Sequence, residues 1–142
     1  MILLDTDHLS VLKFRTSPRA MHLSGRLALA ATASSVGTSV VNVEESMRGW
    51  MAAIAKERLV HRQETAYREL AELFAFFSGL QIALFNAAAI DTFTRLKAAK
   101  IRVSTRDLKI AAIAISRNAL LLTANRRDFE LVPGLRFDNW LD

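Results

Sequence analysis

The sequence has no cysteine, two prolines and five glycines in 142 residues. Without cysteine the chain forms no disulfide, thiolate zinc site or iron–sulfur cluster, uses no thiolate in catalysis and gives no sign of an oxidising compartment. The prolines and glycines occur singly, so no linker, repeat or low-complexity tract divides the chain. We therefore expect one domain over residues 1–142.

Long apolar runs are also missing. Only Met1 and the apolar residues 2–4 precede Asp5, so no basic segment followed by an apolar stretch of signal-peptide length is visible. Residues 108–122 are interrupted by Lys109 and Arg117 and are shorter than the roughly 20 residues that a bilayer span requires. We expect a soluble, cytoplasmic chain that makes no membrane contact.

The composition is basic and rich in apolar residues. Nineteen Lys and Arg against fourteen Asp and Glu give a net charge of +5, which favours a polyanionic partner such as nucleic acid. A basic protein without such a partner is the alternative. Hydrophobic residues make up 51% of the chain, enough to build a globular core.

Short apolar runs between polar residues predict the strands. The runs are residues 2–4, 39–43, 81–85 and 120–122, with a weaker fifth strand after the Pro133–Gly134 turn. Helical periodicity fills the intervening segments, and Asn86 and Ser104 are expected to cap helices. Strands separated by helix pairs predict a three-layer α/β, Rossmann-like fold: a mostly parallel sheet of four to five strands with helices on both faces.

Acidic residues follow the predicted strands, where parallel sheets bind ligands. Asp5 ends the first strand, Glu45 begins the helix after the second, Asp107 lies in the first turn of a buried helix, and Asp128 follows the 120–122 strand with Asn125 between. Like charges in one cleft repel, so the cluster predicts a divalent cation. Carboxylates without cysteine, and with dispersed histidines, favour Mg²⁺ or Mn²⁺ over zinc.

Each of these residues also has a purely structural interpretation. Asp5 and Asp107 suit helix starts, Glu45 suits a first helical turn, and Asn125 and Asp128 suit a turn. Their joint placement, and no single residue, favours the site.

Four motifs carry a family resemblance. They are Leu3 to Thr6, Ser39 to Glu45 with Gly49, Asp107 to Ala112, and Leu121 to Phe129 followed by residues 132–135 and Trp140. In this order and spacing, over essentially the whole length, the chain resembles PIN-domain ribonucleases, specifically the VapC-type toxins of bacterial toxin–antitoxin pairs. The resemblance implies a PIN-like fold.

The family's acidic residues fall on three positions of this sequence: Asp5, Glu45 and Asp107. Glu45 matches better than Glu44 because Gly49 then stands four residues on, as in the family. These residues are expected to hold the metal.

The fourth position falls on Asp128, with Asn125 as the alternative. The chain departs from the family at Asp7, where the family has Asn. Asp7 is either a group behind the site or a solvated acid in a first helical turn, and the sequence favours the second interpretation.

The resemblance implies a metal-dependent endoribonuclease that cleaves structured RNA, either tRNA or rRNA. Mg²⁺ or Mn²⁺ would activate water, and a cognate antitoxin would block the cleft. A homodimer or a toxin–antitoxin hetero-oligomer is expected. Thr6 and Thr123 are expected either to hydrogen-bond the carboxylates or a metal-bound water, or to cap local turns.

A basic rim is expected around the acidic cleft to track RNA phosphates. Its members are Arg95, Lys97, Lys100, Arg102, Arg106, Lys109, Arg126 and Arg127. Met47, Trp50 and Met51 are candidate anchors for an antitoxin helix, although core packing explains them better.

Two other functions remain open. Asp5 and Asp7 imitate the Asp-x-Asp start of haloacid dehalogenase-like phosphohydrolases, but Leu9 replaces a small residue and no downstream Gly-Asp pair follows. The other is a non-catalytic α/β binding module in which the acids are caps and ion-pair partners.

Overall fold

The computed structural model describes residues 1–14 and 16–141, and there strands and helices alternate in the predicted order. The strands are β1 (Ile2–Leu4), β2 (Val36–Ser39), β3 (Gln81–Ala83), β4 (Leu120–Leu122) and β5 (Arg136–Asp138). The helices are α1 (Thr6–Lys13), α2 (Pro18–Ala30), α3 (Val40–Lys56), α4 (Glu64–Ser78), α5 (Ala87–Ala98), α6 (Thr105–Ser116) and α7 (Arg126–Phe129), with a 3-10 turn, η1 (Val60–Gln63), before α4.

The five strands form one sheet in the order β3-β2-β1-β4-β5, and every pairing is parallel. The central strands β1 and β4 consist only of Ile and Leu, as expected of strands covered on both faces. The predicted parallel α/β fold is confirmed, including the fifth strand after the Pro133–Gly134 turn.

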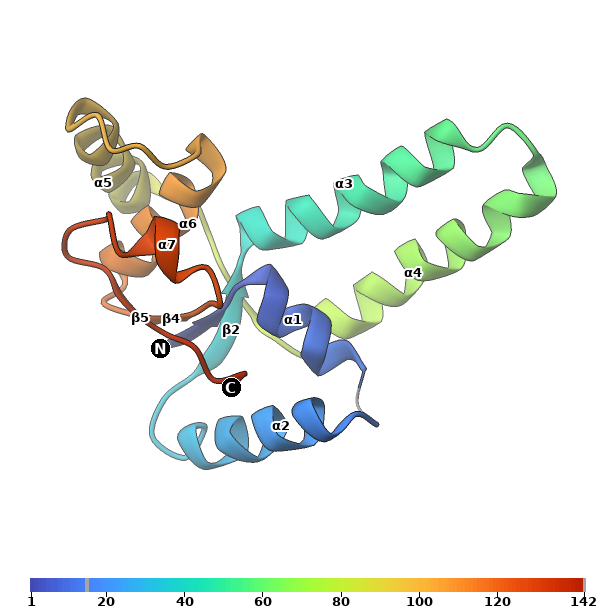
Figure 1. Cartoon of the computed structure of the whole chain (residues 1–142), viewed down its shortest axis with the longest axis horizontal. Helices are drawn as coiled ribbons and strands as arrows, with labels where there is room; N and C mark the ends of the chain where they lie inside the picture. The colour runs from blue at the N-terminus through green and yellow to red at the C-terminus, as the bar shows by residue number, and fades with distance from the viewer. Residues whose placement is uncertain (15, 142) are drawn as a thin grey trace.

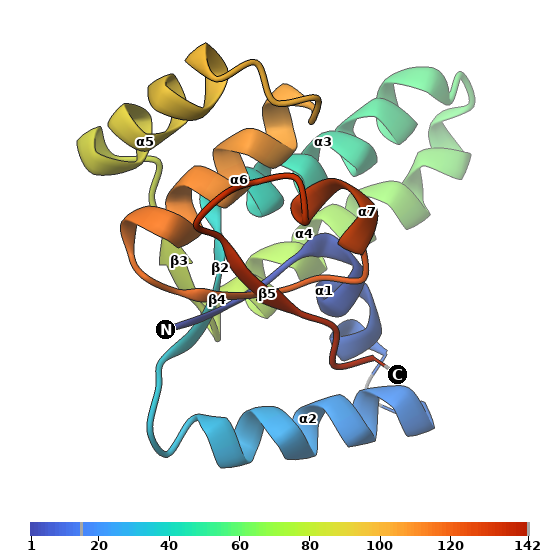
Figure 2. The same ribbon diagram turned by 60° about the vertical axis from the view of Figure 1, so that its left-hand side comes forward.

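Alternate residues of the central strands point into two separate apolar cores. Leu3 and Leu121 pack in one core with residues of α5 and α6, whereas Leu4 and Leu122 pack in the other with residues of α1, α2 and α4. Figures 1 and 2 show α5 and α6 on one side of the strands and α2 on the other. The three predicted layers are therefore present.

Helices α3 and α4 form a long antiparallel pair that extends away from the sheet (Figure 1). The sheet-proximal part of α3 contributes to both cores, with Val41 in the first and Val43 in the second. The start of α3 is thus fixed firmly against the end of β2.

The predicted strand at residues 39–43 is wrong. Strand β2 ends at Ser39, and α3 begins at Val40. The Ser39 hydroxyl accepts a hydrogen bond from the Asn42 N–H (3.1 Å) and donates one to Asn42 Oδ1 (2.6 Å). This reciprocal cap outweighs the strand preference of the valines. Glu45 consequently lies in the second turn of α3 and does not begin the helix.

Other predicted boundaries are closer to the structure. Strand β3 ends at Ala83, two residues earlier than expected. Asn86 and Ser104 accept hydrogen bonds from the first turns of α5 and α6, which confirms both predicted caps. Within residues 1–14 and 16–141, no helix is long and apolar enough to cross a membrane.

Gly37 occupies the place in β2 where the backbone of β3 comes closest. A Cβ atom at Gly37 would collide with the main-chain carbonyl of its register partner, Gln81. We predict that Gly37→Ala lowers the free energy of unfolding by about 1–3 kcal/mol, because the strands must separate to admit the methyl group. Urea unfolding followed by circular dichroism measures the effect.

Gly25→Ala is the matched control. Gly25 is exposed in α2, where an added Cβ meets nothing within 4 Å, so this change should stabilise the chain by up to about 1 kcal/mol through helix propensity. Equal effects of the two substitutions would refute the close approach of β2 and β3.

Candidate active site

Predicted site residues and one further polar side chain, Asn42, gather at the carboxyl edge of the sheet. Asp5 follows β1, Thr123 follows β4, and Asn42 and Glu45 lie in the first two turns of α3 after β2. Strand β2, the next in the sequence, lies on one side of β1, and β4 lies on the other side. This edge is the topological switch point at which open parallel sheets bind ligands.

Asp5 is buried and held from three directions. Its Oδ1 accepts hydrogen bonds from the Thr6 N–H (2.9 Å) and from Asn42 Nδ2 (2.8 Å), and its Oδ2 accepts one from the Thr123 hydroxyl (2.8 Å). Burial raises the pKa of Asp5, and the charge of Asp7 adds to this effect, against the lowering effect of these hydrogen bonds. The hydrogen bonds therefore fix the orientation of the Asp5 side chain, while burial makes its charged form less favourable.

Asn42 is a site residue that the sequence interpretation missed. It is fully buried, and its Nδ2 donates to Thr6 Oγ1 (3.1 Å) as well as to Asp5. A Ser followed three residues later by a polar side chain is a signal for a helix cap, but the surrounding valines suggested a strand. Asn42 joins the start of α3 to the end of β1.

Asp7 is 32% exposed, and both of its carboxylate oxygens are engaged by other parts of the chain. Its Oδ2 accepts the Ala124 N–H (2.8 Å), and its Oδ1 pairs with Nδ1 of the fully buried His8 (2.6 Å). His8 Nε2 in turn accepts the Trp140 N–H (3.1 Å), so Nδ1 is the ring nitrogen that donates to Asp7.

This chain of contacts sets the charge state of Asp7. Burial acts to raise the pKa of Asp7, but the hydrogen bonds from His8 and the Ala124 N–H, together with the charge of His8, bring that pKa below its ordinary value. The interpretation that the sequence favoured for Asp7 is wrong, because contacts with residues more than a hundred positions away cannot be read from a first-turn pattern. Asp7 instead ties α1 to the segment after β4.

Glu45 and Asp107 face each other from α3 and α6 with Arg106 between them. Arg106 Nη1 lies 2.7 Å from Glu45 Oε2, and Nη2 lies 3.5 Å from Asp107 Oδ1. Burial raises the pKa of Glu45, and the charges of Asp5 and Asp107 raise it further, against the lowering effect of Arg106. Asp5 and Asp107 are therefore both close enough to Glu45 for their charges to act on it.

Asp128 and Asn125 form a separate pair beside this cluster. Asn125 Nδ2 donates to Asp128 Oδ2 (3.1 Å) at the start of α7, and the Asn125 N–H donates to Thr123 Oγ1 (3.1 Å). Asn125 thus reaches Asp5 through the Thr123 hydroxyl. Asp128 as the fourth site residue stays a prediction, since its described contact is with Asn125.

A groove of about 430 Å³ between α3 and α6 opens beside Glu45. Its basic lining consists of Arg48, Arg106 and Lys109. Arg48 pairs with Glu44 one turn along α3, and Lys109 lies over the ring of Phe85. Part of the predicted basic rim therefore borders the acidic cluster directly.

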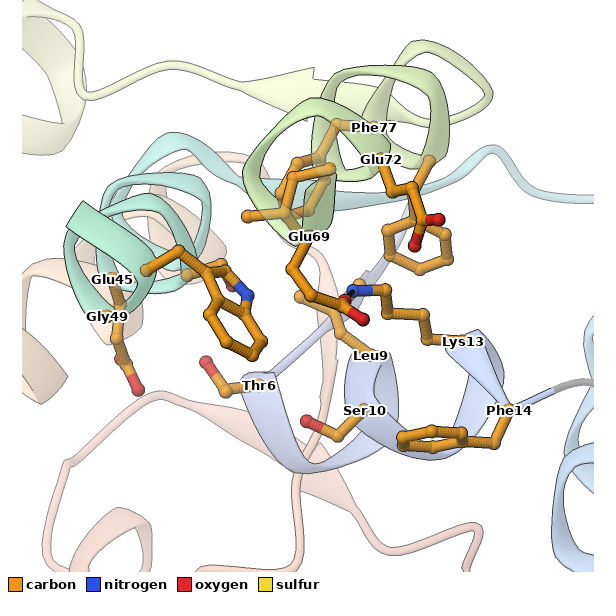
Figure 3. A pocket seen from close by; sticks show the side chains of 14 residues that line it. Thr6, Leu9, Ser10, Lys13, Phe14, Glu45, Gly49, Glu69, Glu72 and Phe77 are labelled. Carbon is orange, nitrogen blue, oxygen red and sulfur yellow. Dashed lines mark hydrogen bonds and ion pairs between the residues drawn. The ribbon is translucent and has the colours of Figure 1, made fainter. Parts of the chain in front are cut away.

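A second groove, of about 510 Å³, runs from Thr6 and Glu45 between α1, α3 and α4 (Figure 3). Trp50 and several aromatic residues line it, and Lys13, which pairs with Glu69 (3.0 Å), lies toward its far end with Phe14. One end of this mainly apolar groove thus reaches the acidic cluster.

Donor chemistry in the cluster suits a hard divalent cation, since Asp5, Glu45 and Asp107 offer carboxylate oxygens without a sulfur or imidazole ligand. Within the described part of the chain, however, no three His, Asp or Glu side chains converge on one point as a metal requires. One of the oxygens concerned, Glu45 Oε2, is engaged by Arg106. The residues offer the oxygen ligands that a hard divalent cation prefers.

Sequence comparisons link the chain to nucleases. The PIN domain family matches residues 2–135. Ribonuclease VapC2 of Rickettsia felis is 31% identical over 85 residues, which cover 57% of this chain and 63% of the relative. The tRNA(fMet)-specific endonuclease VapC of Shigella flexneri is 35% identical over 77 residues, which cover 51% of this chain and 58% of that one. The matched region thus spans less than two thirds of each curated relative.

Solved structures show the same fold. A chain in the crystal structure of VapBC2 from Rickettsia felis bound to a DNA fragment from their promoter has a TM-score of 0.75 at 25% identity, with 99% of both chains covered. A chain of DNA-bound VapBC from Salmonella typhimurium has a TM-score of 0.76 at 24% identity, with 98% of this chain and 97% of that chain covered.

We predict that Asp5→Asn stabilises the metal-free protein at pH 7, because the buried charge of the carboxylate is removed while an acceptor oxygen is kept. Because the pKa of Asp5 is raised above its ordinary value of 3.8, the folded chain retains this proton at pH values where the unfolded chain has lost it. The wild type therefore loses stability as the pH rises through the raised pKa, and the Asn variant does not. Urea midpoints from pH 4 to pH 7 in EDTA measure the growing difference.

Asp5→Ala is the matched variant, because it removes the acceptor atoms together with the charge. It should be less stable than Asp5→Asn, since Asn42, Thr6 and Thr123 lose their acceptor. A loss of about 1 kcal/mol in Asp5→Asn at every pH would show that Asp5 acts mainly as the cap of α1.

Proposed function

Because the chain belongs to the PIN domain family and is related to the VapC toxins of VapBC toxin–antitoxin systems, we propose that it is a metal-dependent endoribonuclease and the toxin of such a pair. This family assignment confirms the resemblance stated from the motifs. The observation that carries the proposal is the placement of Asp5, Glu45 and Asp107, which come from three separate parts of the chain, with Arg106 paired to both Glu45 and Asp107.

The proposed metal ligands are Asp5, Glu45 and Asp107, with Asp128 as a fourth. When bound, Mg²⁺ or Mn²⁺ would activate a water molecule and neutralise charge on the cleaved phosphate. Asp5 provides the fixed point, since Asn42 and Thr123 orient its oxygens.

The remaining acids are positioned differently. Asp107 is held in the first turn of α6 by the Ser104 cap, and its side chain is 7% exposed. Glu45 is 28% exposed and is paired with Arg106. The protein supplies no nucleophile in this proposal; its acids hold and orient the reacting groups, and Asn125 supports Asp5 through the Thr123 hydroxyl.

Structured RNA is the proposed substrate. The net charge of +5 and the basic groove beside Glu45 favour a polyanion, and the relative from Shigella flexneri is named a tRNA(fMet)-specific endonuclease. We therefore propose tRNA as the first substrate to test, with rRNA as the second class. Basic residues that contact phosphates would make binding depend strongly on salt.

A cognate antitoxin is the proposed partner, because the similar chains come from VapBC complexes. The groove between α1, α3 and α4 suits an apolar segment that ends near Glu45 (Figure 3). Of the three candidate anchors, Met47 and Trp50 pack against the core as expected, and Trp50 also lines this groove. Met51 is 59% exposed, contrary to the core packing favoured for it. A toxin–antitoxin hetero-oligomer or a homodimer is proposed as the assembly.

The phosphohydrolase alternative is not supported. It requires Asp7 to act as an acid and base beside Asp5, but the oxygens of Asp7 are taken up by His8 and the Ala124 N–H. Membership of the PIN domain family also argues against it.

Cleavage of labelled tRNA in the presence of Mg²⁺ tests the proposed function. Asp107→Asn should lower the cleavage rate at least about a hundredfold, because one ligand of the activating metal becomes neutral, while RNA binding persists. Asp91→Asn, on the exposed face of α5, is the control and should cleave at the wild-type rate.

Unchanged cleavage by Asp107→Asn would remove this residue from the site. Loss of RNA binding together with cleavage would instead favour a non-catalytic binding module in which the acids have structural roles.

A further inference from the structure

The Arg106 side chain places a positive charge inside the acidic cluster. One of its terminal nitrogens contacts Glu45 at 2.7 Å, and the other lies 3.5 Å from Asp107. Among the residues that the structure describes, Arg106 is the basic side chain paired with these acids. It therefore offsets the repulsion among the carboxylates when no metal is bound.

The three side chains differ in their freedom to move. Arg106 is 51% exposed, Glu45 is 28% exposed and Asp107 is 7% exposed. The Ser104 cap fixes the backbone at the start of α6, since its hydroxyl accepts the Asp107 N–H at 3.2 Å. A change in the cluster is therefore made by the arginine and glutamate side chains, while Asp107 stays in place.

The ion pair also occupies an oxygen that a metal would use. Arg106 Nη1 contacts Glu45 Oε2, and no three acidic or histidine side chains among residues 1–14 and 16–141 converge on a common point. A cation that takes Glu45 Oε2 as a ligand would have to displace the guanidinium from this oxygen. Two cations beside one carboxylate would also repel each other.

We propose that Arg106 is an internal counter-ion that competes with the divalent metal for Glu45, so that the metal binds only when the guanidinium swings out of the cluster. This inference depends on the proposed metal-dependent function. It assigns Arg106 a role other than phosphate binding: the side chain sets the metal concentration at which the site fills. Room for the displaced guanidinium exists on the side of the groove between α3 and α6.

Titration of the full chain with Mn²⁺, followed by electron paramagnetic resonance of the free ion, tests the proposal without any measurement of cleavage. Arg106→Gln should bind Mn²⁺ about fivefold more tightly than the wild type, as expected from the loss of one partly exposed ion pair. Arg106→Met, which keeps much of the aliphatic side chain, is a second variant and should show the same gain.

Arg102→Gln is the charge-matched control, since Arg102 is exposed just before the same helix and is not among the ion pairs of the cluster. Its affinity for Mn²⁺ should stay within about twofold of the wild type, because exposed charges are screened by salt. Thermal unfolding gives a second readout. In EDTA the Arg106 variants should unfold at a lower temperature than the wild type. Saturating Mn²⁺ should raise the unfolding midpoint of the variants by more than it raises that of the wild type.

Equal or weaker Mn²⁺ binding by the Arg106 variants would overturn the competition while leaving the metal-dependent function in place. An equal gain in Arg102→Gln would also overturn it, since a general charge effect would then explain the result. If neither the wild type nor the variants bind Mn²⁺, the competition and the proposed metal-dependent function both fail.

Discussion

The buried carboxylate of Asp5 at the end of the central strand is the constraint to which much of the structure responds. An ionised carboxylate with 8% exposure is costly unless hydrogen bonds replace the lost water. Donors come from the start of α1, from α3 and from the end of β4, and each hydrogen bond to a charged group contributes about 1.5–3 kcal/mol. The carboxylate thus ties together three elements that are distant in the sequence.

The polar composition of β2 follows from the same constraint. Thr38 and Ser39 are fully buried, where a strand between two others would ordinarily carry aliphatic residues. The Thr38 hydroxyl donates to the Leu4 carbonyl, and Ser39 begins the helix that carries Asn42 to Asp5. These residues therefore provide less apolar packing than aliphatic side chains would, but their hydrogen bonds fix the position of α3 relative to the end of β1.

The parts of the site that the sequence predicts are those set by local patterns. The apolar runs predicted the strands that end before Asp5 and Thr123, and the predicted cap at Ser104 placed Asp107 in the first turn of a helix. The position of Asn42 was mispredicted because valines favour strand while the Ser39 cap favours helix, and only the packing of α3 against both cores decides between them. Similarly, the role of Asp7 depends on His8 and Trp140, a contact across more than a hundred residues.

Arg106 shows why the electrostatics of the site are harder to predict than its position. The sequence assigns it to a basic rim for RNA, since it stands in a run of positive charges. Its neighbour Asp107 is buried, however, and the helix geometry that buries Asp107 also directs the guanidinium across to Glu45 on α3. The same region therefore combines a rigid part, Asp5 with its hydrogen-bond donors, and a movable part, the ion pair of Glu45.

This division has a physical basis in burial. Asp5 exchanges water for fixed donors, so any displacement of its carboxylate would leave Asn42 and Thr123 without an acceptor in the interior. The pair of Glu45 and Arg106 is partly exposed, and water can replace either partner at little cost. A ligand that enters the cluster will therefore find one carboxylate already oriented and will rearrange the other, which makes the exchange at Glu45 the step that controls occupancy.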